Sequence, residues 1–174
     1  MKRNILLIAT GGTIASQNSA HGLAPLIRAE EILSHIPDVY QICNPTAMQI
    51  CNIDSTNMEP RHWKLLAETI RSNYGKYDGF VVAHGTDTLA YTAAALSYMV
   101  QNSSKPIVLT GAQKSIDLDI TDAKTNLLDS FCYAADGKSQ GVQIVFGGKV
   151  IAGTRAKKIR SKSYNAFDSI DFPF

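Results

Sequence analysis

The sequence lacks a long apolar segment. A helix that crosses a membrane needs about 20 consecutive apolar residues, whereas the opening apolar run covers only residues 4–9. No charged segment leads into a cleavable apolar stretch, so the sequence predicts neither a signal peptide nor a membrane partner. We therefore expect a cytoplasmic protein.

Patterns typical of disulfides, metal sites and nucleotide loops are missing as well. The three cysteines include no Cys-x-x-Cys pair, which is typical of reduced thiols in a cytosolic protein. The four histidines lack the spacing of metal ligands, so we expect no zinc site. The phosphate-binding motifs Gly-x-Gly-x-x-Gly and Gly-x4-Gly-Lys-Ser/Thr are both absent.

Positive charge is concentrated near the end of the sequence. Residues 149–162 carry six lysines and arginines and no acid, although the net charge of the whole chain is only +2. A solvated surface is the simplest interpretation, and a nucleic-acid patch or one buried catalytic lysine are the alternatives. Because no aromatic residue or RNA-binding motif accompanies these charges, we predict no nucleic-acid partner.

Short apolar strands alternate with helical segments along the 174 residues. The predicted strands are residues 4–9, 39–43, 48–53, 80–83, 107–109 and 141–146, and the predicted helices lie within residues 26–36, 60–70, 89–100 and 121–134. In the second helix Trp63 shares an apolar face with Leu66 and Ile70, so we expect it in the core. The alternation predicts one α/β domain: a mostly parallel open sheet with helices on both faces, a Rossmann- or flavodoxin-like three-layer fold.

Residues 10–15, Thr-Gly-Gly-Thr-Ile-Ala, follow the first predicted strand. Two glycines permit backbone angles and close approaches that a Cβ would prevent. The hydroxyl of Thr13 then lies at the carboxyl end of a strand, where open α/β sheets bind their ligands. Three interpretations remain open here: a plain tight turn, a nucleotide loop, or a turn that carries a nucleophilic threonine.

The same pattern of strand, glycine and polar residue recurs twice. Residues 84–88, His-Gly-Thr-Asp-Thr, follow one strand, and residues 110–113, Thr-Gly-Ala-Gln, follow the next. Two such turns at the carboxyl edge of one sheet are expected to converge on a single pocket. Two other polar segments have simpler defaults, because residues 54–58 are typical of a helix cap and residues 16–22 of a surface loop beside the site.

These motifs closely resemble the two signature segments of the bacterial-type L-asparaginases. The resemblance covers essentially the whole chain and favours the cytoplasmic type I branch. It implies hydrolysis of an amide through a covalent acyl-enzyme, with L-asparagine, or alternatively L-glutamine, as the small-molecule substrate and with no cofactor. The residues that correspond to the family's catalytic groups are Thr13 as nucleophile, Thr86, Asp87 and Lys158.

The resemblance also implies substrate contacts. The corresponding positions are Gly12, Ser55, Gly85, Thr86, Asp87 and Ala112. In the family, residues matching Ser55 and Asp87 hold the substrate's α-carboxylate and α-ammonium, and the carbonyl matching Ala112 positions the scissile amide. A lysine five residues after a glycine is also a family feature, which the spacing from Gly153 to Lys158 keeps.

Two departures from the family accompany the resemblance. Family members often carry a tyrosine in the loop after the first threonine, whereas residues 22–25 here contain Leu23, and no tyrosine lies between Thr13 and Tyr40. The family also has a smaller carboxyl-terminal domain, so we expect residues 1–174 to be the amino-terminal catalytic domain without it. The intact enzyme is expected to be a homo-oligomer. The same signatures occur in the amidase subunit of a tRNA-dependent amidotransferase, and a non-catalytic nucleotide-binding module is a further alternative.

Overall fold

A six-stranded sheet forms the middle layer of the protein. The structure, a computed structural model, describes residues 1–19 and 22–174, and only the backbone of residues 18, 19 and 22–25. The sheet order is β4 (Asn44–Ile53), β1 (Asn4–Gly11), β5 (Gly79–Ala83), β6 (Pro106–Thr110), β7 (Gly141–Phe146) and β8 (Lys149–Ala152). The first five strands are parallel and β8 is antiparallel to β7.

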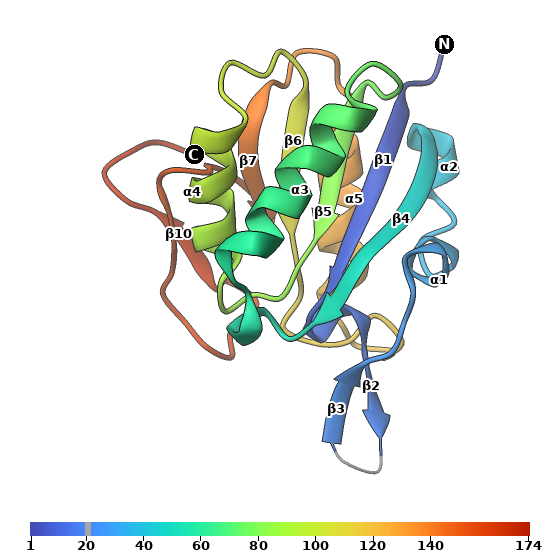
Figure 1. The fold of residues 1–174 in the computed structure, drawn as a ribbon. Helices are drawn as coiled ribbons and strands as arrows, with labels where there is room; N and C mark the ends of the chain where they lie inside the picture. Colours follow the sequence, from blue (N-terminus) through green and yellow to red (C-terminus); the bar gives the residue numbers. More distant parts are fainter. Residues whose placement is uncertain (20–21) are drawn as a thin grey trace.

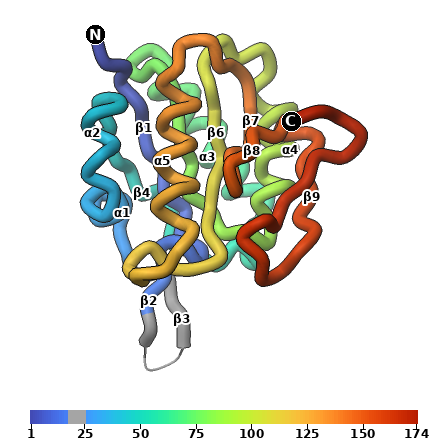
Figure 2. Tube along the Cα trace, turned by 180° about the vertical axis from the view of Figure 1, so that it is seen from behind, coloured from blue at the N-terminus to red at the C-terminus, as the bar shows by residue number. Residues whose placement is uncertain are grey.

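Helices cover both faces of this sheet, as the sequence predicts. One face packs on α3 (Pro60–Asn73) and α4 (Leu89–Met99), which lie in front in Figure 1. The other face packs on α1 (Ala29–Ser34), α2 (Val39–Ile42) and α5 (Ala123–Ala135), seen from behind in Figure 2. Successive residues of β1 divide between the two faces, because a strand alternates its side chains: Leu6 and Ile8 join one core, and Ile5 and Leu7 the other.

The strand order places a ligand-binding crevice between β1 and β5. Numbered along the chain, the parallel strands run 2-1-3-4-5, so the chain leaves β1 toward one side of the sheet and later returns to its other side. Open α/β sheets bind ligands at the carboxyl ends of the strands where the order reverses in this way. Residues 10–15 follow β1 and residues 84–88 follow β5, so both signature segments lie at this point.

Smaller elements surround the carboxyl edge of the sheet. A hairpin of β2 (Ser16–Ser19) and β3 (Gly22–Pro25) projects from that edge in Figure 1. A second antiparallel pair joins β9 (Ala156–Lys158) to β10 (Phe167–Ser169). The 3-10 turns η1 (Thr13–Ala15) and η2 (Ser55–Asn57) follow β1 and β4. The second pair puts Lys158 on a strand, which the sequence did not predict.

Two predicted elements are wrong. The strand predicted at residues 39–43 is instead the helix α2 (Val39–Ile42), whose C-cap is Cys43. Its buried Val39 packs in the core, and four residues are too few for periodicity to distinguish a helix from a strand. Residues 44 and 45, predicted as a break, begin β4. A proline is tolerated there because β4 lies at the edge of the sheet, where a missing N–H costs no ladder bond.

Two further expectations need correction. The segment from residue 16, expected to be a loop, begins with β2, because the backbone ladder of the hairpin depends little on side-chain polarity. Residues 20 and 21 of that expected loop lie outside the described residues. Trp63, expected in the core, is only half-buried, and its indole N–H donates to the hydroxyl of Thr92 at 2.9 Å. A buried indole needs such a partner.

Asn126 of α5 ties together two glycine turns at the carboxyl edge. Its amide nitrogen donates to the carbonyl of Gly111 at 3.0 Å, and its amide oxygen accepts from the N–H of Gly147 at 2.9 Å. The side chain is 2% exposed. Without this carboxamide the buried carbonyl of Gly111 would lose its partner, and the turn at Gly147, which is exposed, would lose its link to α5.

We expect Asn126→Leu to lower the free energy of unfolding by about 3 kcal/mol, since it leaves a buried carbonyl and a backbone N–H unpaired. Urea unfolding followed by circular dichroism measures the change. Asn57→Leu is the control, because Asn57 is exposed, and it should change the free energy by about 0.5 kcal/mol or less. Equal losses in the two variants would contradict this role of Asn126.

Candidate active site

The first two glycine turns touch through their backbones. Gly12 has φ +80°, and a Cβ added to it would lie 2.4 Å from the Cα and the nitrogen of Gly85. A Cβ added to Gly85 would lie 2.6 Å from the hydroxyl oxygen of Ser55. Only glycine fits at either position, because the surrounding atoms include backbone that cannot give way. The ends of β1, β4 and β5 thus meet at one point.

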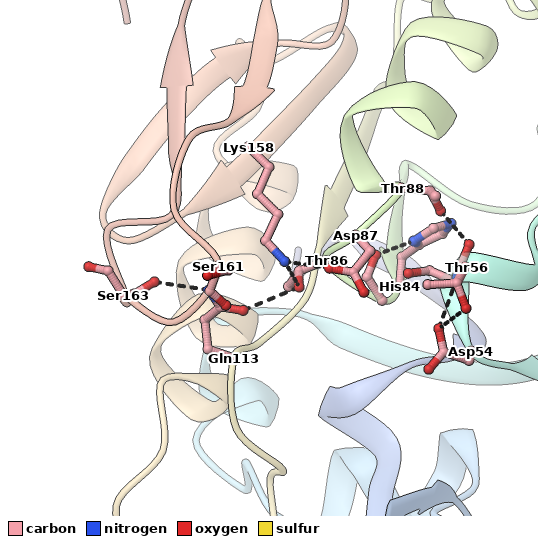
Figure 3. A network of polar contacts seen from close by, with 12 residues as sticks. Asp54, Thr56, His84, Thr86, Asp87, Thr88, Gln113, Lys158, Ser161 and Ser163 are labelled. Carbon is pink, nitrogen blue, oxygen red and sulfur yellow. Dashed lines mark hydrogen bonds and ion pairs between the residues drawn. The ribbon is translucent and has the colours of Figure 1, made fainter.

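Lys158 reaches this point from β9. Its Nζ donates to the hydroxyl of Thr86 at 2.8 Å and lies 2.7 Å from a carboxylate oxygen of Asp87, as Figure 3 shows. The Lys158 side chain is 17% exposed, whereas that of Asp87 is 58% exposed. The ammonium group is therefore largely covered, and its countercharge remains open to a ligand. The preceding residue, Lys157, is exposed on the alternate side of the same strand.

Gln113 closes the network on the other side of Thr86. The Thr86 hydroxyl donates to Oε1 of Gln113 at 3.2 Å, while Nε2 donates to the carbonyls of Ser161 and Ser163, each at 3.1 Å (Figure 3). The buried carboxylate of Asp122 accepts from the backbone N–H of Gln113 at 2.9 Å. One carboxamide thus connects the turn after β6 with the segment that follows Lys158.

Thr13 begins η1 next to the Gly12–Gly85 contact and is half-buried. It lines a pocket of about 160 Å³ together with Ser16 and Gln113, so the first and third glycine turns share a cavity. Within the described part of the chain, no hydrogen bond occupies the hydroxyl of Thr13. The side chain of Leu23, at the position where family members often carry a tyrosine, is not among those that the structure describes.

Ser55 and Ala112 both lie at the carboxyl edge of the sheet, just after β4 and β6. Ser55 is buried against Gly85, and its carbonyl accepts from the hydroxyl of Thr88 at 2.8 Å. Asp54 accepts from the N–H of Thr56 at 2.8 Å and so caps η2, whereas the N-cap of the helix α3 that follows is Glu59. Ala112 is fully buried just after β6. All the predicted site residues therefore belong to turns or strands at the same edge of the sheet.

A family model described as "Asparaginase, N-terminal" matches residues 4–174. The chain belongs to the asparaginase family. The L-asparaginase of Thermococcus kodakarensis is 38% identical over 97% of this chain and 52% of its own length. One component of the glutamyl-tRNA(Gln) amidotransferase of Pyrococcus abyssi is 38% identical over 96% of the chain and 40% of its own length.

The fold of this asparaginase domain is similar to that of solved L-asparaginase structures. The crystal structure of L-asparaginase I from Vibrio cholerae O1 superposes on this chain with a TM-score of 0.89 at 35% sequence identity. The superposition covers 99% of this chain and 53% of the Vibrio cholerae chain. The predicted family and three-layer fold are therefore confirmed. The chain spans about half the length of the L-asparaginases that it matches.

Residues 1–19 and 22–174 contain neither a cluster of metal ligands nor a membrane-spanning helix. No group of three or more histidine, cysteine, aspartate or glutamate side chains there is arranged to hold a metal ion. No helix in that part of the asparaginase domain is long and apolar enough to cross a membrane.

The sequence of this asparaginase domain did not single out the side chains of Gln113 and Asp122. The glycine turn before Gln113 drew attention to the segment, but its spacing gave no reason to select the carboxamide. Asp122 precedes α5, where an acid is ordinarily explained as a helix cap. Its actual partners are the N–H groups of Gln113 and Lys114, which only the folded chain brings within 3.1 Å.

His84 is the third residue of the site that the sequence did not assign. The imidazole is fully buried, and its ring nitrogens contact the carbonyl of Gly85 at 2.7 Å and the hydroxyl of Thr92 at 3.0 Å. Burial lowers the pKa of His84 from 6.5 to about 4, against the opposing effect of the Gly85 carbonyl, so the ring is neutral near pH 7.

We expect acid to destabilise the domain partly through His84. Between pH 6.5 and pH 4 the unfolded chain binds a proton at this ring and the folded chain does not, so the free energy of unfolding falls as the pH is lowered. The full loss is on the order of 3 kcal/mol. Urea unfolding at several pH values between 7 and 4 measures the slope.

His84→Gln should flatten this pH dependence, whatever its effect on stability at pH 7. His35→Gln serves as the control, because His35 is only half-buried and has no side-chain hydrogen bond in the described part of the chain. A slope that responds to His35→Gln and not to His84→Gln would refute the assignment.

Proposed function

We propose that this chain is the catalytic domain of an amidohydrolase that converts L-asparagine to L-aspartate and ammonia through an acyl-enzyme on Thr13. The observation that carries the proposal is the position of Lys158, whose Nζ lies 2.8 Å from the hydroxyl of Thr86 and 2.7 Å from Asp87. A threonine hydroxyl is a weak nucleophile near neutral pH and needs a base or a polarising network. A lysine held among a threonine and an aspartate supplies that network.

The proposed reaction begins with attack of the Thr13 oxygen on the side-chain carboxamide carbon of asparagine. The proton of Thr13 enters a relay formed by Thr86 and Lys158, and the relay delivers a proton to the departing nitrogen, which leaves as ammonia. Water then attacks the acyl-enzyme and gives a proton to the same relay. The relay returns a proton to the Thr13 oxygen as the ester bond breaks, so that aspartate is released and the threonine hydroxyl is restored. Backbone N–H groups of the glycine turns stabilise the negative charge on the tetrahedral intermediates.

The substrate's two charges would be matched at the open side of the site. Asp87 is half exposed beyond its contact with Lys158, so its carboxylate has room for the α-ammonium. Pairing there would share the Asp87 charge between the α-ammonium and Lys158. The backbone and hydroxyl of Ser55 are proposed to hold the α-carboxylate, because an unpaired charge is costly to remove from water. The carbonyl of Ala112 and the turns at Gly12 and Gly85 would position the amide.

A second candidate function is the amidase subunit of a tRNA-dependent amidotransferase. It is favoured by relatives such as the Pyrococcus abyssi protein, as similar to this chain as the L-asparaginase from Thermococcus kodakarensis. Glutamine would then be the substrate and its ammonia would pass to a partner. Ammonia release from asparagine with neither tRNA nor ATP present favours the asparaginase. Ammonia release from glutamine but not from asparagine, with a rate that rises when charged tRNA is added, favours the amidotransferase.

Residues 1–174 are proposed to supply the reacting groups, with other parts of the intact enzyme, a homo-oligomer, completing the substrate pocket. A cytoplasmic location is proposed from the likeness to the type I branch. We propose no nucleic-acid partner for the asparaginase itself and no cofactor, because a lysine and hydroxyl relay can handle the proton transfers of both steps.

Thr13→Ala and Thr86→Ala are each expected to lower kcat for asparagine by at least about 10³-fold in the protein that carries this chain, since both belong to one catalytic unit. An ammonia-release assay measures the rate, and circular dichroism checks the fold. Thr125→Ala, at an exposed position of α5, is the control and should keep the wild-type rate. Near-normal turnover by Thr86→Ala would remove that residue from the mechanism.

Lys158 and Lys157 offer a matched comparison of neighbouring residues. Lys158→Met should lower kcat by about 10²-fold or more, because it removes the proton acceptor. Lys157→Met should leave kcat nearly unchanged, because its side chain is exposed and has no hydrogen bond in the described part of the chain. Reversed effects in the same ammonia assay would show that the wrong lysine has been assigned.

A further inference from the structure

A chain of buried hydrogen bonds runs behind the turn that carries Thr86. The indole N–H of Trp63 on α3 reaches the hydroxyl of Thr92 on α4 at 2.9 Å. The same hydroxyl lies 3.0 Å from Nε2 of His84, and Nδ1 of His84 lies 2.7 Å from the carbonyl oxygen of Gly85. His84 and Thr92 are both fully buried, so water does not take part.

The end groups fix the direction of every bond in this chain. A carbonyl oxygen can only accept, so Nδ1 of His84 carries the proton and donates to Gly85. An indole N–H can only donate, so Thr92 accepts from Trp63 and gives its own proton to Nε2 of His84. A neutral imidazole protonated at Nδ1 satisfies all of these groups at once.

The bond to Gly85 determines how the next N–H is aimed. The peptide between Gly85 and Thr86 is trans and planar, so its N–H points opposite to its C=O. Because the carbonyl points at His84 in the core, the N–H of Thr86 points away from the core. No acceptor contacts that N–H within the described residues, and it belongs to the residue whose hydroxyl meets Lys158.

We propose that His84 is a positioning residue for catalysis: by donating to the Gly85 carbonyl it fixes the Gly85–Thr86 peptide, so that the Thr86 N–H is aimed at the oxygen that becomes negative as the amide is attacked. The inference rests on the proposed amide hydrolysis. A donor fixed in advance acts mainly on the transition state, because the charge develops there and the protein need not reorganise. A role in core packing alone would not require a ring with this pattern of donor and acceptor.

Two substitutions separate the two ring nitrogens. His84→Asn keeps an N–H near the position of Nδ1 and loses the contact with Thr92, whereas His84→Gln keeps a group near Nε2 and leaves the Gly85 carbonyl unpaired. We expect His84→Gln to lower kcat for asparagine about tenfold or more with KM nearly unchanged. His84→Asn should restore kcat to about a third of wild type or better, although it also removes part of the buried ring.

Trp63→Phe is the matched control for stability. It removes the donor to Thr92 but leaves the bond from His84 to Gly85, so it should lower the melting temperature and keep kcat. Equal kcat values for His84→Asn and His84→Gln would overturn the proposal. So would a loss confined to KM, or losses of kcat that follow the melting temperature through all three variants.

An NMR measurement tests the geometry without relying on hydrolysis. In the wild-type protein with 15N-labelled histidine we expect the Nδ1–H tautomer of His84 near pH 7. The Thr86 amide resonance should move more in His84→Gln than in His84→Asn. An Nε2–H tautomer, or equal shifts, would overturn the positioning role. If the wild-type protein released no ammonia from asparagine or glutamine, the proposed function would fail, and these NMR results would still decide whether His84 sets the peptide.

Discussion

The close contact between the Gly12 and Gly85 backbones is the constraint on which the rest of the site depends. It brings the ends of β1 and β5 together at the point where the strand order reverses, closer than any side chain would allow. Thr13 follows one glycine and Thr86 the other, so the proposed nucleophile and its proposed relay come from the ends of two strands rather than from one loop. Ser55 completes the contact from the end of β4.

The remaining groups reach this point from less regular parts of the chain. Lys158 comes from a short strand pair outside the main sheet, and Gln113 connects that region with Thr86 through one carboxamide. Behind them, Asn126, Asp122 and His84 satisfy buried backbone groups. Each is a polar side chain in a buried position, so the cost of burying it is offset by the hydrogen bonds that it makes.

Local pattern was sufficient for most of the fold, and its failures have identifiable causes. The five parallel strands and the helices α3, α4 and α5 follow from apolar periodicity and glycine breaks. The strand predicted for residues 39–43 was wrong because five residues with three apolar positions fit a strand and a helical turn equally well. Pro45 suggested a break because the sequence does not say which strand lies at the edge. Trp63 was expected to be buried because periodicity gives the face of the helix but not how far that face is covered.

The sequence by itself determined the three-layer α/β class, the glycine turns and the kinds of polar residue that follow them, because these depend on neighbours a few positions apart. The tertiary structure alone decided how those residues act together. Lys158 and Thr86 are 72 residues apart, and Gln113 and Ser163 are 50 apart, so no local pattern encodes their contacts. The proton position on His84 follows from partners that are close in the sequence, the carbonyl of Gly85 and the hydroxyl of Thr92, but only the fold of the turn and of α4 aims them at the two ring nitrogens.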